Sequence, residues 1–278
     1  MTIARTLDEL APSLGGVLVP TMGALHVGHL DLVRHAATIA HDRGGLPVVV
    51  SIFVNPTQFD EQHDYDRYPR QVEHDAQRCF DAGATCVFAP QVETMYPPDG
   101  SVGVPPIPAV GDGPGLEDTY RPGHFAGVCQ VCNRLFELCE PVASVFGEKD
   151  WQQLRVVTAM VEAAGMGIDI VGYPTVRETD GLAMSSRNVH LDDEERARAA
   201  ALSKALRAAG AVDEPTAAEA TGRTILEAAS IETEYFAVRE ARDLLRQPEP
   251  GEAGRVLVAG RLGLTRLIDN APWPAMPG

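Results

Sequence analysis

Short apolar runs alternate with helix-like stretches along the first part of the chain. The runs lie at residues 16–19, 47–54, 85–89, 143–146 and 168–171. Apolar residues at helical spacing lie between them, at 30–43, 70–81, 125–139 and 151–164. Continuous runs rich in valine and isoleucine are typical of parallel strands that helices cover on both faces. The pattern therefore predicts an α/β fold with a doubly wound (Rossmann-like) parallel sheet, in which ligands bind at the carboxyl ends of the strands.

The pattern changes after about Tyr173. An extended polar stretch leads to an alanine-rich helical region with a turn at Asp213-Glu214-Pro215, and two strand-like segments follow at 234–238 and 255–259. We therefore predict two domains, the doubly wound one at residues 1–174 and a smaller α+β C-terminal domain at 175–278.

Two further stretches of the first domain carry weaker predictions. Residues 1–10 have the look of a short helix. Residues 97–122 are rich in proline and glycine and predict a long surface loop, of a length that is typical of lids and binding loops.

Composition and charge narrow the class of protein. The hydrophobic content of 45% and charged content of 22% are near globular averages, and the formal net charge is −16. Such a negative surface repels nucleic acids and anionic membranes, so neither is an expected partner. Five cysteines, the absence of a leader-like start and the absence of an apolar run of about 20 residues favour a cytoplasmic protein.

The first chemical signal follows the first predicted strand. It reads Thr21-Met22-Gly23-Ala24-Leu25-His26-Val27-Gly28-His29. Glycines let the backbone approach a ligand, and a helix that begins here offers free N–H groups and a positive dipole end to an anion. His26 and His29, three residues apart, project from one side of the first turn and can donate hydrogen bonds to phosphate oxygens. A zinc site and two surface histidines are the alternatives, although zinc would need a third ligand.

Two more segments suit a phosphate ligand. Gly147-Glu148-Lys149-Asp150 again follows a predicted strand, and Lys149 is one of only two lysines in the chain. A compact ammonium suits a phosphate, but charged residues also cap helix starts without any ligand. Ser185-Ser186-Arg187 offers hydroxyl and guanidinium donors on a loop, although serine is equally common in ordinary turns.

Together these motifs resemble the pantothenate synthetases (pantoate–β-alanine ligases), a family of the nucleotidylyltransferase superfamily with a His-x-Gly-His signature and a Lys-Met-Ser-Lys-Ser-type loop. The resemblance runs from about Leu18 to Asn188, and more loosely through Leu267-Ile268-Asp269-Asn270. Other segments that carry it are 51–59 (SIFVNPTQF), 66–70 (DRYPR), 121–128 (RPGHFAGV) and Gln152-Gln153.

The resemblance implies ATP-dependent formation of pantothenate in two half-reactions. The carboxylate of pantoate attacks the α-phosphorus of ATP, giving pantoyl adenylate and pyrophosphate, and the amine of β-alanine then attacks the acyl carbon, giving pantothenate and AMP. Mg²⁺ as a cofactor and a homodimer are implied in the same way. Residues 1–174 would bind nucleotide and pantoate, while residues 175–278 carry the Met-Ser-Ser-Arg loop.

Roles of single residues are implied as well. His29 and Lys149 are expected to act in catalysis, with His29 facing the phosphates as the proton donor. The residues expected to bind ATP are Met22, Gly23, Ala24, Leu25, His26, Val27, Gly28, His29, Gly147, Glu148, Lys149, Asp150, Val176, Met184, Ser185, Ser186 and Arg187. Gln58 and Gln153 would hold pantoate, and Gln58 would also face β-alanine. Further substrate-side residues are Asn55, Tyr68, Arg121 and His124, and no metal ligand is assigned.

Some residues differ from the family pattern, and others allow a different interpretation of the site. Val27 stands where glutamate is usual in the family, and we expect it to face away from the ligand. Cys129 and Cys132 form a Cys-x-x-Cys pair, but they lie on an apolar helical stripe and indicate core packing rather than a redox or metal site. Glu73 and Asp75 are interpreted as part of a solvated helix face rather than as Mg²⁺ ligands.

Two other functions stay open from the sequence. One is a nucleotidylyltransferase that keeps the nucleotide on its product. The other is a non-catalytic nucleotide-binding module, against which the presence of both His29 and Lys149 argues.

Overall fold

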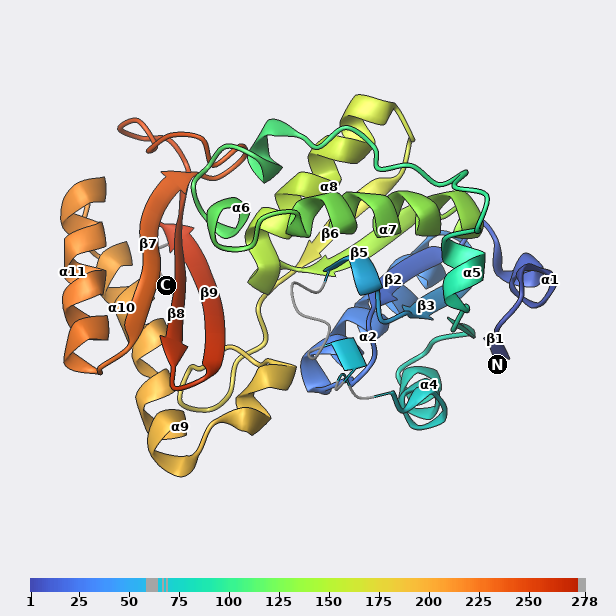
Figure 1. Cartoon of the computed structure of the whole chain (residues 1–278), viewed down its shortest axis with the longest axis horizontal. Helices are drawn as coiled ribbons and strands as arrows, with labels where there is room; N and C mark the ends of the chain where they lie inside the picture. Colours follow the sequence, from blue (N-terminus) through green and yellow to red (C-terminus); the bar gives the residue numbers. More distant parts are fainter. Residues whose placement is uncertain (59–64, 67, 69, 275–278) are drawn as a thin grey trace.

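The structure, a computed structural model, describes residues 1–58, 65–66, 68 and 70–274 (Figure 1). Its larger sheet has six parallel strands among these residues, in the order β1-β4-β3-β2-β5-β6. The strands are β1 (Thr2–Ala4), β2 (Val17–Thr21), β3 (Val48–Ile52), β4 (Cys86–Phe88), β5 (Ala143–Gly147) and β6 (Asp169–Tyr173). The predicted doubly wound parallel sheet is confirmed, and its strand order reverses between β2 and β5.

Helices cover both faces of this sheet. α2 (Val27–Asp42) and α4 (Val72–Asp81) share one hydrophobic cluster with the sheet, and α7 (His124–Cys139) and α8 (Trp151–Ala164) share another. Neighbouring residues of one strand belong to different clusters: Val17 and Val19 to the first and Leu18 to the second. Because both faces are buried, the strands read as continuous apolar runs in the sequence.

The C-terminal part contains an antiparallel sheet, β7-β8-β9, which lies beside the larger sheet in Figure 1. The strands are β7 (Glu232–Glu240), β8 (Gly254–Leu262) and β9 (Thr265–Trp273), and the helices are α9 (Asp193–Ala199), α10 (Ala201–Gly210) and α11 (Pro215–Ala228). Phe236 and Val258 share a core with α10 and α11, while Tyr235 and Leu257 share the core around α7 and α8. The small sheet is therefore packed on both sides, and one side anchors it to the larger unit.

Some predicted elements differ from the observed ones. Thr2–Ala4 forms a strand that pairs with β4, and helix α1 (Leu7–Leu10) begins only after Thr6, whose side chain accepts a hydrogen bond from the N–H of Glu9. The long loop contains a helical turn, η3 (Ala109–Gly111), and the short helix α6 (Glu117–Tyr120). The remaining short elements are η1 (Ala11–Ser13), η2 (Pro56–Gln58), α5 (Val92–Met95), η4 (Glu148–Asp150) and η5 (Ser186–His190).

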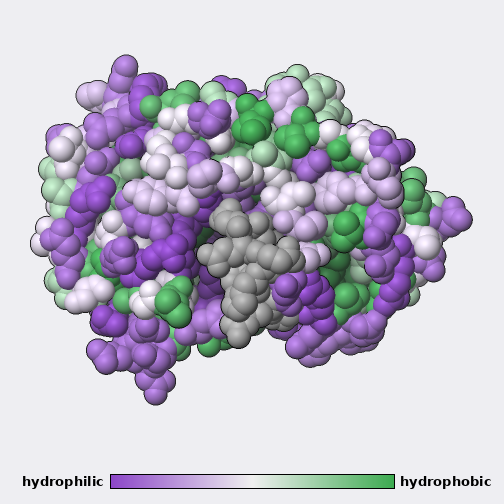
Figure 2. Space-filling view, viewed as in Figure 1, coloured by the Kyte–Doolittle hydropathy of each residue, from purple (hydrophilic) through white to green (hydrophobic). Residues whose placement is uncertain are grey.

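The predicted domain boundary at 174/175 lies just after β6, and it stays a prediction. Polar residues dominate the face of the molecule in Figure 2, and apolar side chains form small separate groups on it. In the part of the chain that the structure describes, no helix has the length and apolar character needed to cross a bilayer.

Candidate active site

Four neighbouring strands of the larger sheet carry predicted site residues beyond their carboxyl ends. β3 is followed by Asn55 and Gln58, β2 by residues 22–29, β5 by residues 147–150, and β6 by Val176. Because these strands are parallel, their carboxyl ends lie at one edge of the sheet. The strands β2 and β5 also flank the point of order reversal, where sheets of this kind bind ligands.

The two histidines of the first motif lie against each other at the start of α2. His26 is the N-cap residue, and its ring centroid is 4.0 Å from that of His29. The backbone N–H of His26 donates to Nδ1 of His29 at 3.3 Å. Since Nδ1 of His29 accepts a hydrogen bond, the neutral ring carries its proton on Nε2, where it is available as a donor.

Burial keeps both imidazoles neutral. Burial, which is the largest cause, and the neighbouring His26, Lys149 and Arg78 together lower the pKa of His29 to about 3. Burial and the charge of Lys149 also lower the pKa of His26. Lys149, which follows a different strand, therefore lies within electrostatic reach of the first motif. In the free protein at neutral pH, His29 is a hydrogen-bond donor without a charge.

Helix α4 holds the loop that leads to these histidines. The backbone N–H groups of Ala24 and Leu25 donate to the carboxylate of Asp75 at 2.8 and 3.2 Å, and Arg78 donates to the carbonyl of Leu25. Asp75 is only 2% exposed, so its interpretation as part of a solvated face was wrong. A signal was available in the sequence, because Asp75 lies four residues before the buried Cys79 and so on the same side of the helix.

Replacing Asp75 with asparagine should weaken ATP binding. Gly23 and Ala24 have φ values of 86° and 51°, and the left-handed conformation of Ala24 needs support from its surroundings. An amide offers one acceptor oxygen in place of two, which leaves one backbone N–H unpaired. We expect a loss of about tenfold in ATP affinity, measured by calorimetry, since a hydrogen bond to a charged group contributes about 1.5–3 kcal/mol.

Glu73→Gln, on the exposed side of the same helix, is the matched control for this substitution. Unchanged ATP affinity in Asp75→Asn would contradict the role of Asp75 in holding the loop.

Lys149 lies at the end of β5 with little to neutralise it. Its side chain is 16% exposed, and Asp150, itself half exposed, is 3.8 Å away. Asp150 is the N-cap residue of α8, yet its side chain makes no capping hydrogen bond within the described structure. The helix-cap alternative is therefore weakened, and the position of Lys149 beside two imidazoles favours an anionic ligand.

The third motif lies against the first. Burial raises the pKa of Tyr68, while the positive charge of Arg187 and a hydrogen bond with Ser186 oppose this effect. The hydroxyl of Tyr68 also donates to the carbonyl of Gly23 at 3.3 Å. Ser185 accepts a hydrogen bond from the N–H of Arg187 at 3.2 Å. The serine–arginine loop is thus linked through Tyr68 to the loop after β2.

Val176 brings the segment after β6 to the same place. Its carbonyl accepts a hydrogen bond from the N–H of Met184 at 2.9 Å, which fixes the start of the loop. A Cβ atom at Gly28 would lie 3.6 Å from Cβ of Val176 and 3.0 Å from the ring of His26. The absence of a side chain at Gly28 therefore allows this close approach.

Asn55 contacts protein groups rather than open space. It is fully buried; Nδ2 donates to Gln58 Oε1 at 3.0 Å and to the carbonyl of Gly127 at 3.2 Å, and Oδ1 accepts from the hydroxyl of Tyr96 at 2.8 Å. The hydrogen bond to Gln58 therefore places Asn55 to orient the side chain of Gln58.

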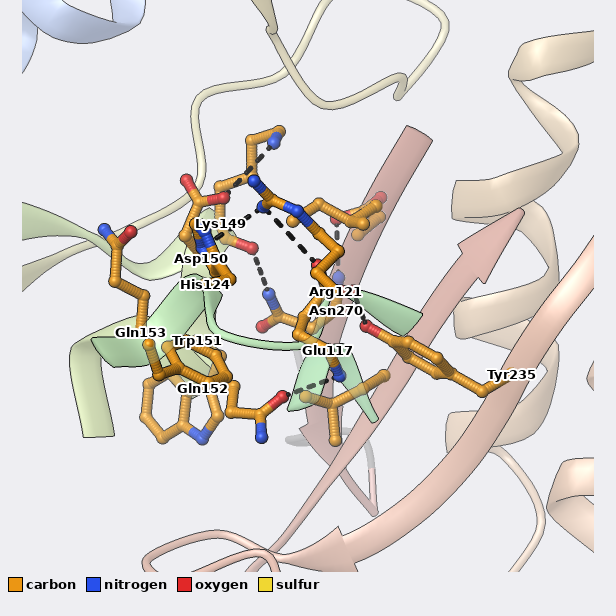
Figure 3. A pocket seen from close by; sticks show the side chains of 14 residues that line it. Glu117, Arg121, His124, Lys149, Asp150, Trp151, Gln152, Gln153, Tyr235 and Asn270 are labelled. Carbon is orange, nitrogen blue, oxygen red and sulfur yellow. Dashed lines mark hydrogen bonds and ion pairs between the residues drawn. The ribbon is translucent and has the colours of Figure 1, made fainter. Parts of the chain in front are cut away.

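A pocket between the two sheets contains other predicted substrate-side residues (Figure 3). Its lining includes the predicted substrate-side residues Arg121, His124 and Gln153, together with Lys149, which was expected to bind ATP. Nη1 of Arg121 lies 3.1 Å from Nε2 of His124, and burial together with Arg121 lowers the pKa of His124 to about 3. Because Nε2 faces a guanidinium donor, the neutral ring carries its proton on Nδ1, which is buried without a partner among the described residues. His29 does not line this pocket but is linked to it through Lys149.

Residues 4–272 match the model of the family described as Pantoate-beta-alanine ligase. The chain belongs to this ligase family. A pantothenate synthetase of Corynebacterium jeikeium (strain K411) is 49% identical, over 94% of this chain and 83% of the relative. A pantothenate synthetase structure from Thermus thermophilus has a TM-score of 0.89 and 42% identity, over 98% of this chain and 99% of that chain. A pantoate-beta-alanine ligase from Francisella tularensis, complexed with Beta-gamma ATP and Beta-alanine, has a TM-score of 0.77 and 29% identity, covering 98% of this chain and 97% of that one.

Membership of the ligase family confirms the resemblance drawn from the motifs and makes the chain an enzyme. Val27, the departure from the family pattern, is 49% exposed, as expected for a residue that faces away. The predicted core packing of Cys129 and Cys132 is confirmed, because both side chains are buried in the hydrophobic cluster around α7 and α8. No group of three or more metal-ligating side chains converges within the described residues, so the zinc alternative gains no support.

Proposed function

We propose that this ligase condenses (R)-pantoate with β-alanine, using ATP and releasing AMP and pyrophosphate through a pantoyl-adenylate intermediate. What supports the proposal is that Lys149 lies within electrostatic reach of His29. In addition, Ser186 and Arg187 lie close to Tyr68, whose hydroxyl contacts the loop after β2. Two lines support it further: the family itself, and the ligands named for the relative from Francisella tularensis.

The first half-reaction joins two anions. Most of its barrier therefore comes from the repulsion between their charges and from the need to align the reacting atoms. The triphosphate would lie at the start of α2, where the helix dipole and free N–H groups favour negative charge. Lys149 would offset the charge of the departing pyrophosphate, and Nε2–H of His29 would donate to a phosphate oxygen. A neutral imidazole suits this place because it adds a donor without adding repulsion to the neighbouring ammonium.

The carboxylate of pantoate would be oriented by Gln58 and Gln153, with its attacking oxygen in line with the α-phosphorus. Closure of residues 184–187 would exclude water, which otherwise hydrolyses the mixed anhydride. In the second half-reaction the amine of β-alanine attacks the acyl carbon, and AMP leaves. His124 lines the pocket together with Arg121, and the two side chains would contact a bound substrate there.

The metal ion, the roles of the two domains, the cellular location and the oligomeric state belong to the same proposal. Mg²⁺ would arrive with the triphosphate, held mainly by phosphate oxygens and water as is usual for this ion, and would offset phosphate charge. Residues 1–174 would form the nucleotide- and pantoate-binding domain and residues 175–278 the domain that carries the segment 184–187. The ligase would be a cytoplasmic homodimer.

Isotope exchange tests the function. With pantoate, ATP and Mg²⁺ but no β-alanine, we expect labelled pyrophosphate to exchange into ATP, and we expect AMP to accumulate only after β-alanine is added. A nucleotidylyltransferase would keep the nucleotide on its product, and a binding module would give no turnover. Either result, or exchange that requires β-alanine, would overturn the proposal.

A further inference from the structure

Strand β9 carries the segment Leu267-Ile268-Asp269-Asn270, to which no role has been given so far. Asn270 is 3% exposed, and its Nδ2 donates to the carbonyls of Glu148 and Lys149 at 2.9 and 2.8 Å. Its Oδ1 accepts a hydrogen bond from Nε of Arg255 at 2.6 Å. One side chain of the C-terminal sheet therefore holds the two peptide groups that carry the side chain of Lys149 (Figure 3).

Arg255 of β8 reinforces this hold on the turn after β5. Its guanidinium lies 3.6 Å above the ring of Trp151, and its Nη2 donates to the carboxylate of Glu148 at 3.0 Å. The indole N–H of Trp151 donates to the carbonyl of Ala241 at 3.0 Å. The turn is thus fixed at its backbone, at its acidic side chain and at its aromatic ring, always from the C-terminal part.

The residue before Asn270 holds the other phosphate-side segment. Both carboxylate oxygens of Asp269 accept hydrogen bonds from Arg177, at 2.7 and 3.0 Å, and its side chain is 1% exposed. Arg177 pairs with Ala183 directly before the serine–arginine loop. Two adjacent residues of β9 therefore tie together the turn of Lys149 and the base of that loop.

We propose that Asn270 is the positioning residue for Lys149, and that the pair Asp269–Asn270 sets the spacing between this ammonium and the serine–arginine loop. Lysine has a flexible stem and no fork of donors, so the place of Nζ depends on where its backbone is held. A displacement of about 1 Å at a reacting centre can lower a rate by about 100-fold. The inference rests on the role proposed for Lys149 above.

The two half-reactions separate positioning from a general structural role. In Asn270→Ala we expect kcat for pyrophosphate exchange to fall by about 10- to 100-fold, by the same argument on displacement, with little change in KM for pantoate. Reaction of prepared pantoyl adenylate with β-alanine should stay within about threefold of the parent, since no triphosphate charge has to be offset there. Asn133→Ala, on the outer side of α7, is the matched control.

Asn270→Asp keeps the shape of the side chain and an acceptor oxygen for Arg255, but it loses both N–H donors to the two carbonyls. It should show the same selective loss of pyrophosphate exchange even where the alanine variant does not fold. In a Lys149→Ala background, a further Asn270→Asp change should have little effect on exchange, because residues that act as a unit are not additive. Equal losses in both half-reactions, or a full additional loss in the double variant, would overturn the inference. Absence of exchange in the unchanged enzyme would instead overturn the proposed function.

Discussion

Lys149→Ala should lower the rate of adenylate formation by about two orders of magnitude or more, which is what one preorganised donor to transition-state charge typically contributes. The ammonium is mostly buried, and its carboxylate neighbour Asp150 is 3.8 Å away and half exposed. Its charge is therefore available to the phosphates and is poorly screened by solvent. Single-turnover release of pyrophosphate from ATP and pantoate measures the effect.

The chain offers a matched control for this substitution. Lys204, its only other lysine, is exposed on α10, and Lys204→Ala should release pyrophosphate at the parent rate. Lys149→Arg keeps the charge but replaces a compact ammonium with a planar fork, so partial activity is expected. Near-normal pyrophosphate release by Lys149→Ala would refute the assignment.

His29→Ala should also be severely impaired, by about 10²–10³ in the rate of adenylate formation, as for loss of one donor in a water-poor site. The pH profile adds a second readout. With a pKa of about 3 in the free protein, His29 does not change charge between pH 5.5 and 8. The pH dependence of kcat/KM for ATP reports ionisations of the free enzyme. Any ionisation that it shows near pH 6.5 should therefore still be present in His29→Ala.

His41→Ala, an exposed histidine near the end of the same helix, is the control for His29. In the parent enzyme, kcat/KM for ATP could instead rise as the pH falls through 6.5. If this rise disappeared only in His29→Ala, the charged imidazole would be the active form. The tautomer and the neutral donor inferred from the hydrogen bond to Nδ1 would then both be wrong.

Much of the fold was predictable because the apolar pattern was continuous. Helix α8 has the predicted bounds, since a buried strand and a glycine precede it and its apolar residues keep helical spacing. The first two motifs lie at one edge of the sheet for a related reason: each follows the carboxyl end of a parallel strand, and such ends meet at one edge. The serine–arginine loop lies farther from its strand, and its place could not be predicted in this way. The short strand β1 was missed because three residues are too few to show a period.

The residues that hold the site in place were not predictable from the chain alone. Strand β9 mixes apolar residues with Asp269 and Asn270, two residue types that are mostly exposed in proteins. They are buried only because Arg177, Arg255 and the carbonyls after β5 satisfy their hydrogen bonds. Such partners are set by tertiary packing and leave no local pattern.

A crystal structure of the protein with pantoate and a non-hydrolysable ATP analogue tests the central claim most directly. The account predicts one triphosphate with its oxygens within hydrogen-bond distance of Nε2 of His29, Nζ of Lys149 and the hydroxyl of Ser186 or the guanidinium of Arg187. A nucleotide bound elsewhere, or one that leaves these groups facing separate cavities, would contradict it.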